Sequence, residues 1–107
     1  MHIEYVYIGR DNVIDLQLQD DSSGSMTNTD LSTATKVGVA LDATTEYDSD
    51  ANPDQVSFSS SGVVSLELGT LIDADGRYIA EIIVYDSDHP NGIAWQPRFM
   101  IHALESE

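Results

Sequence analysis

The strongest constraint on this chain is the alternation of apolar and polar side chains along much of its length. In residues 12–19, Ile14, Leu16 and Leu18 alternate with acidic or amide side chains. This two-residue period places successive side chains on opposite faces of a strand, and it is typical of a strand with one buried face. Apolar residues rarely recur at the three- and four-residue spacing of a helix. The sequence therefore predicts an all-β protein.

The same alternation recurs in several further segments, and we expect about seven strands, the first near residues 3–8. This number is typical of an immunoglobulin-like antiparallel β-sandwich, which we predict as the fold. Pro97 interrupts the last segment and cannot donate to a ladder, so we expect an edge position or a bulge there. The residues expected to point inward in these segments are Val37, Val39, Leu41, Val56, Phe58, Val64, Leu66, Leu68, Ile93, Trp95, Phe99, Ile101 and Ala103.

Residues 77–85 differ from the other strands because both of their faces are apolar. One face carries Tyr78, Ala80, Ile82 and Val84, and the other carries Ile79, Ile83 and Tyr85. A strand of this kind is either central in a sheet or part of an interface. The interface residues that we predict are Tyr5 and Tyr7 of the opening strand together with Ile79, Ile83 and Tyr85.

The length of 107 residues is that of one domain, and we treat residues 1–107 as a single unit. Two polar segments separate the expected strands by more than a short turn. Residues 20–33 are rich in Ser, Thr, Asp and Asn, and residues 42–54 are rich in acids. We expect both segments to be long loops that are mobile or held from outside.

Charge is the most unusual feature of the composition. Nineteen Asp and Glu residues face only Arg10, Lys36, Arg77 and Arg98, which gives a formal net charge of −15. A phosphate backbone would be repelled by such a surface, so nucleic acid is excluded as a partner. The negative charge either keeps the protein soluble or is matched to a basic partner or to cations.

No apolar stretch reaches the length of roughly 20 residues that spans a bilayer. The first residues also lack the basic and apolar regions of a signal peptide. We therefore expect a soluble protein that is made in the cytoplasm and has no membrane partner.

One short segment places oxygen-bearing side chains at every second position. Asp48, Asp50, Asn52 and Asp54 recur as in the first half of a calcium loop. Pro53 stands where the tight-turn glycine of an EF-hand belongs, however, and no helices are expected on either side. Calcium is the one cofactor that the sequence suggests. The alternative interpretation is that this segment is a solvated acidic turn.

The sequence offers no pattern of catalytic residues. It contains no cysteine and no Gly-x-Ser-x-Gly motif, and its three histidines lack the spacing of metal ligands. The chain also has little length left to build a cleft for paired carboxylates. We therefore predict that the protein is not an enzyme.

The aromatic residues allow two interpretations. They could form a sugar-stacking platform, as in carbohydrate-binding modules, or they could belong to a sandwich core with tyrosine hydroxyls at its edges. Most of them fall on the inward side of an alternating strand, which favours the core. The residues concerned are Tyr5, Tyr7, Phe58, Tyr78, Tyr85, Trp95 and Phe99.

In the order of these features, the chain resembles the small immunoglobulin-like domains of tailed-bacteriophage virion proteins, which occur in head decoration proteins, head fibres and baseplate components. Three segments carry the resemblance, and it extends from about Tyr5 to Leu104. They are Gly9-Arg10-Asp11-Asn12 before an alternating strand, the turn Asp73-Ala74-Asp75-Gly76-Arg77-Tyr78 into the long apolar strand, and the closing run from Tyr85 to Trp95.

The resemblance implies a virion structural or accessory protein that performs no reaction. A capsid decoration (cement) protein or a head-fibre protein would stabilise the particle through contacts with the major capsid protein or other virion proteins, with self-association into a homo-oligomer as a further option. A tail or baseplate component, or a carbohydrate- or calcium-binding module on a surface, is the alternative. The implied location is the virion, after synthesis in the host cytoplasm.

Overall fold

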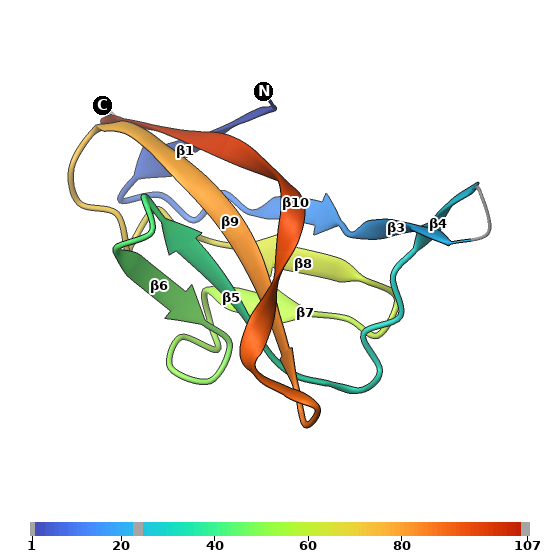
Figure 1. Ribbon diagram of the computed structural model, residues 1–107. Coiled ribbons are helices and arrows are strands. Elements are labelled where there is room, and N and C mark those ends of the chain that lie inside the picture. The colour runs from blue at the N-terminus through green and yellow to red at the C-terminus, as the bar shows by residue number, and fades with distance from the viewer. Residues whose placement is uncertain (1, 23–24, 106–107) are drawn as a thin grey trace.

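The computed structural model describes residues 2–22 and 25–105 (Figure 1). Within these residues the chain forms strands and no helix, so none has the length and apolar character needed to cross a membrane. The prediction of an all-β protein is confirmed. The strands are β1 (Ile3–Ile8), β2 (Ile14–Gln17), β3 (Gln19–Ser22), β4 (Ser25–Asn28), β5 (Ala34–Leu41), β6 (Thr45–Asp48), β7 (Val56–Phe58), β8 (Val63–Leu66), β9 (Gly76–Asp86) and β10 (His89–Glu105).

The strands form a sandwich of two main sheets. One sheet has five strands in the order β1-β10-β9-β5-β6, and the other has three in the order β2-β8-β7. Strands β3 and β4 pair only with each other in the described residues, and Figure 1 shows their hairpin extending away from the two layers. The chain passes between the main sheets after β1, between β2 and β5 by way of the β3–β4 hairpin, after β6 and after β8. These passages place strands that are distant in sequence side by side.

The expected purely antiparallel arrangement is wrong at one position. β1 runs parallel to β10, with a register from Ile3 opposite Met100 to Ile8 opposite Glu105. Parallel neighbouring strands need a long connection. Here strands β2 to β9 lie between β1 and β10 in the sequence and provide it. The parallel strand makes the five-stranded sheet mixed.

The two segments predicted to be long loops contain strands. The first includes the β3–β4 hairpin, with Gln19 opposite Asn28, and the second includes β6, which pairs with β5 from Gly38 opposite Asp48. Backbone hydrogen bonds form these strands in segments that lack a regular apolar alternation. The described residues accordingly contain ten strands where the sequence predicted about seven.

The core lies between the two main sheets and matches most of the predicted inward positions. Val37, Val39, Val64, Leu66 and Ile101 are completely buried in it. Phe58 and Trp95 are partly buried and pack against the same cluster. The other predicted residues that are buried are Ile14, Leu18, Leu41, Val56, Leu68, Ala80, Ile82, Val84, Phe99 and Ala103.

The predicted inward position of Ile93 is wrong, since this side chain is 40% exposed. Ile93 directly follows a register shift between β9 and β10 that begins at His89, close to the hairpin turn. A second shift between Trp95 and Phe99 confirms the bulge that Pro97 predicted. The segment of β10 before Met100 also pairs with β9 alone within the described residues.

The buried position of Leu66 predicts a large loss of stability on truncation. Leu66→Ala removes a side chain with no exposed surface, so the free energy of unfolding should fall by about 2–5 kcal/mol. The matched control is Val13→Ala, at a side chain that is 56% exposed, where the change should stay within about 0.5 kcal/mol. Urea unfolding of the three proteins measures both values. Equal losses for the two variants would contradict the assigned core.

Candidate interaction surface

The five-stranded sheet has one face on the core and one face that points away from the other sheet, which we call the outer face. Cross-strand partners share a face, so the row Ile3, Met100 and Ile79 lies on the outer face, as does the row Tyr5, His102 and Arg77. The predicted interface residues Tyr5, Tyr7, Ile79, Ile83 and Tyr85 all belong to this face. The structure therefore places on one surface the residues that the sequence singled out on two separate strands.

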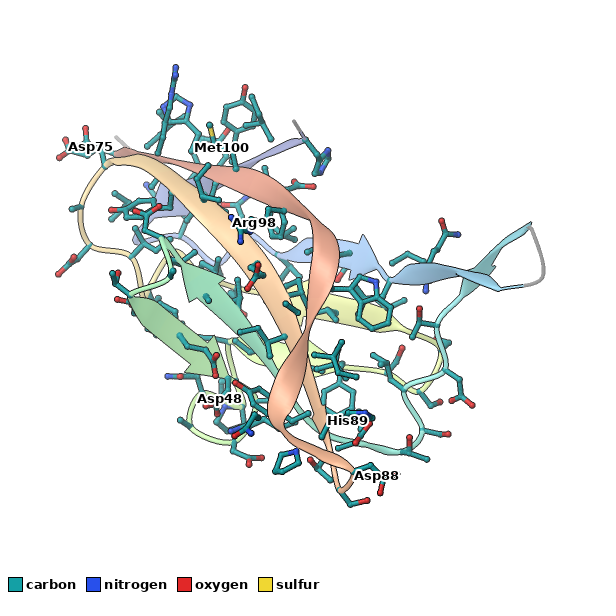
Figure 2. The ribbon with its side chains drawn as sticks, viewed as in Figure 1. Asp48, Asp75, Asp88, His89, Arg98 and Met100 are labelled. Carbon is teal, nitrogen blue, oxygen red and sulfur yellow. The ribbon has the colours of Figure 1, made fainter. Side chains whose placement is uncertain are left out.

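The outer face is most apolar and most exposed at β1. Ile3, Tyr5 and Tyr7 are 44%, 49% and 40% exposed, respectively. The Tyr5 ring is tilted against the His102 ring, with 5.7 Å between their centroids. Figure 2 shows Met100 on β10, the strand next to β1. Large exposed apolar side chains that gather in this way are typical of an interaction surface.

The backbone of β1 is also available on one side, because β1 is the end strand of its sheet. The Met100 amide donates to the His2 carbonyl at 2.9 Å, so the even-numbered residues of β1 direct their backbone groups toward β10. Ile3, Tyr5 and Tyr7 then direct theirs toward the open edge. The Tyr7 carbonyl accepts a hydrogen bond from the Arg10 amide at 3.0 Å, which agrees with a carbonyl that points away from β10.

A close backbone approach fixes the end of β1. The Gly9 amide donates to the Gly69 carbonyl at 2.7 Å. A Cβ atom at Gly69 would collide with the backbone carbonyls of Arg10 and Tyr7, so only glycine fits there. The segment that follows β8 thus holds β1 in place at the rim of the sheet.

At the opposite end of the outer face, Tyr85 belongs to a charged network. Its hydroxyl donates to the Glu46 carboxylate, at 2.7 Å from Oε2, and the Lys36 Nζ lies 4.3 Å from the centroid of its ring. Gly38 leaves room for this carboxylate, since a Cβ there would come within 3.0 Å of Glu46 Oε2. Burial, followed by the hydrogen bond and charge of Glu46 and the charge of Asp48, raises the pKa of Tyr85 to about 12.

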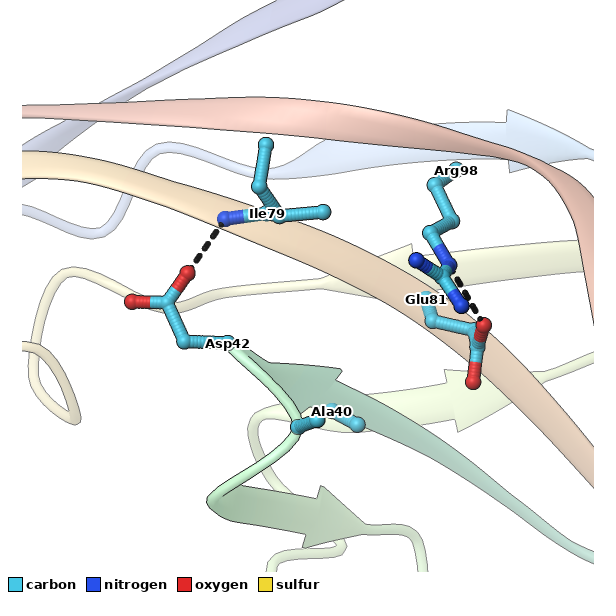
Figure 3. Close-up of a pocket in the computed structure, with 6 residues that line it drawn as sticks. Ala40, Asp42, Ile79, Glu81 and Arg98 are labelled. Carbon is cyan, nitrogen blue, oxygen red and sulfur yellow. Dashed lines mark hydrogen bonds and ion pairs between the residues drawn. The ribbon is translucent and has the colours of Figure 1, made fainter.

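A shallow hollow of about 320 Å³ lies on the outer face where β5 ends beside β9 (Figure 3). Arg98 Nε donates to Glu81 Oε2 at 2.9 Å on one side, and Asp42 Oδ1 accepts from the Ile79 amide at 2.8 Å on the other. Asp42 and Ala43 both have left-handed backbone conformations, with φ of 53° and 59°. No pattern in the sequence indicates this hollow, because it depends on a turn and on strands that are far apart in the chain.

Basic residues are distributed unevenly in the molecule. Lys36, Arg77 and Arg98, three of the four in the chain, lie on the outer face. Lys36 lies 3.9 Å from Asp48 Oδ2, and Arg98 pairs with Glu81. The outer face also carries Glu46, Asp48 and Glu81, whereas most of the 19 acids of the chain lie elsewhere, so the outer face is closer to neutral than the remainder. Charge counting along the sequence missed this asymmetry.

The residues of the predicted calcium site lie at the end of β6 and in the turns after it. Asp48 Oδ1 accepts hydrogen bonds from the amides of Asp50 and Ala51, at 3.0 and 2.7 Å, and the Asn52 amide donates to the Asp48 carbonyl. These bonds give Asp48 a structural role in the turn. Across the part of the chain that the structure describes, no group of three or more acidic, His or Cys side chains is arranged to hold a metal. Calcium binding stays a prediction.

Most of the aromatic residues fall into two groups, and Tyr85 belongs to the charged network of the outer face. Phe58, Tyr78 and Trp95 pack against the core, and Phe99 is buried in it. Tyr5 and Tyr7 are exposed on β1. Most of the aromatics that the sequence suggested for a sugar platform are therefore used in packing.

Comparisons of the chain with protein-family models, with curated proteins and with solved structures gave no match.

The environment of Tyr85 predicts an unusual titration. Its folded pKa of about 12 exceeds the ordinary value of 10.0, so its contribution to stability is complete below pH 10 and is lost as the pH rises through about 12. In Glu46→Gln the acceptor is no longer charged, so the pKa should fall toward 10.0. Ultraviolet absorbance titration of tyrosinate measures this change. Glu67→Gln, on the segment after β8, is the control, and an equal shift in both variants would contradict the assignment.

Proposed function

We propose that this chain is a non-enzymatic structural protein that works by binding other proteins. The observation that carries the proposal is the end of the outer face at β1, where Ile3, Tyr5 and Tyr7 are exposed beside an open strand edge. Natural proteins usually protect an edge strand with charges, prolines or a covering segment. An edge that combines exposed aromatic residues with unpaired backbone groups is suited to contact with a partner.

In its finer form, the proposal is that the chain is a capsid decoration (cement) or head-fibre protein of a tailed bacteriophage. Two observations support it: the sequence resembles the small immunoglobulin-like domains of tailed-bacteriophage virion proteins, and the strand order is compatible with such a domain. Variable-type immunoglobulin domains place strands C′, C, F and G in one sheet and strands B, E and D in the other. The orders β6-β5-β9-β10 and β2-β8-β7 correspond to these, whereas the β3–β4 hairpin is an addition.

A decoration protein needs no reaction to perform its task. A protein that binds only the assembled shell shifts the assembly equilibrium toward the shell by mass action. The acidic remainder of the surface, within a chain of net charge −15, would then keep the bound protein well solvated. The outer face, which is closer to neutral, would be the contact surface.

The proposal predicts that the protein is a component of purified virus particles. Mass spectrometry of gradient-purified particles should detect it at a fixed copy number, and particles that lack it should lose integrity at a lower temperature or after milder osmotic shock. Light scattering after size exclusion, with calcium and with EDTA, measures self-association and tests Asp48, Asp50, Asn52 and Asp54 as ligands. Absence of the protein from particles would contradict the virion proposal.

A further inference from the structure

From the open edge of β1 we infer that this strand binds an extended, basic segment of a partner protein by strand addition. This inference rests on the proposed function, and it names the site and the chemistry of the partner. The partner segment would become the sixth strand of the five-stranded sheet, next to β1. Main-chain hydrogen bonds would supply affinity, and the alternating side chains of the segment would supply specificity.

The backbone of β1 presents the groups that such a strand requires. Even-numbered residues of β1 bond to β10, so the amides of Ile3, Tyr5 and Tyr7 and the carbonyls of Ile3 and Tyr5 face outward. Within the described residues no hydrogen bond uses these outward groups. They repeat every second residue along the edge, which is the spacing of a β-ladder.

The side chains of the same residues define what the partner segment carries. Ile3, Tyr5 and Tyr7 project from the outer face, so every second residue of an added strand would lie beside one of them. Apolar side chains at these positions would cover surface that is now 40% or more exposed. The segment should therefore alternate, with apolar residues on the outer-face side.

The net charge of the whole molecule favours a basic partner, although the outer face itself is closer to neutral, and it disfavours a second copy of this chain. Two copies that met at β1 would bring together two molecules of net charge −15, and each would carry Glu4 on the pairing strand. Like charges at an interface oppose association, whereas a basic segment is steered toward this field. By comparison, β6 at the other end of the sheet carries Glu46 and Asp48, the kind of charge that protects an edge.

The probe is a display library of random twelve-residue peptides that is selected on the whole chain. We expect the enriched peptides to alternate apolar residues, to carry net positive charge, and to bind more weakly as NaCl increases. Enrichment of acidic peptides, or no enrichment, would overturn the inference. Amide exchange measured by NMR should show new protection at Ile3, Tyr5 and Tyr7 when an enriched peptide binds.

The decisive variants are Tyr5→Pro and Tyr5→Thr. Both remove the aromatic ring, but only proline removes the outward amide, and neither removes a bond to β10. Tyr5→Pro should bind the enriched peptides at least about tenfold more weakly than Tyr5→Thr. Equal affinities would overturn strand addition. Thermal unfolding verifies that each variant folds, and Ile3→Pro with Ile3→Thr provides a second pair of the same design.

Incorporation of the variants into virus particles distinguishes this inference from the proposed function. If wild-type protein is present in purified particles and Tyr5→Pro is incorporated as well as Tyr5→Thr, strand addition is wrong and the virion proposal stands. If Tyr5→Pro alone is lost from the particles, both are supported. If wild-type protein is absent from particles while the peptide selection behaves as expected, the virion proposal is wrong and strand addition stands.

Discussion

The packing of two sheets around one apolar core is the interaction on which the rest of this structure depends. The chain has no cysteine, so no disulfide can compensate for a loss of packing. Val37, Val39, Val64 and Leu66 are completely buried, and their positions determine which face of each sheet points inward. A slip of one residue in any strand would exchange its two faces, so the core also determines which residues remain outside.

The outside residues of the five-stranded sheet differ from one end to the other. At β6, which is also an end strand, Glu46 and the neighbouring Lys36 are engaged with Tyr85, so the side chains at this end are charged and hydrogen-bonded. At β1, the exposed side chains are Ile3, Tyr5 and Tyr7, and the backbone edge is open. The two ends of one sheet thus have different chemistry, and only the β1 end offers both apolar surface and backbone groups to a partner.

The sequence predicted those parts of the fold that depend on local alternation. It located the strands of the core and the bulge near Pro97. It could not predict the parallel pairing of β1 with β10, because that pairing joins the two ends of the chain. The strand β6 and the hollow beside Asp42 were missed for a related reason, since each is formed by backbone pairing or turn geometry without an apolar pattern.

The central claim is that β1 pairs on one side only and keeps a free edge for a partner. Residue-resolved hydrogen exchange of the isolated protein tests it most directly, because backbone amides bonded within a sheet exchange slowly. We predict slow exchange at Glu4, Val6 and Ile8, which face β10, and fast exchange at Ile3, Tyr5 and Tyr7. Uniform protection along β1, or protection of the odd-numbered amides alone, would contradict the account.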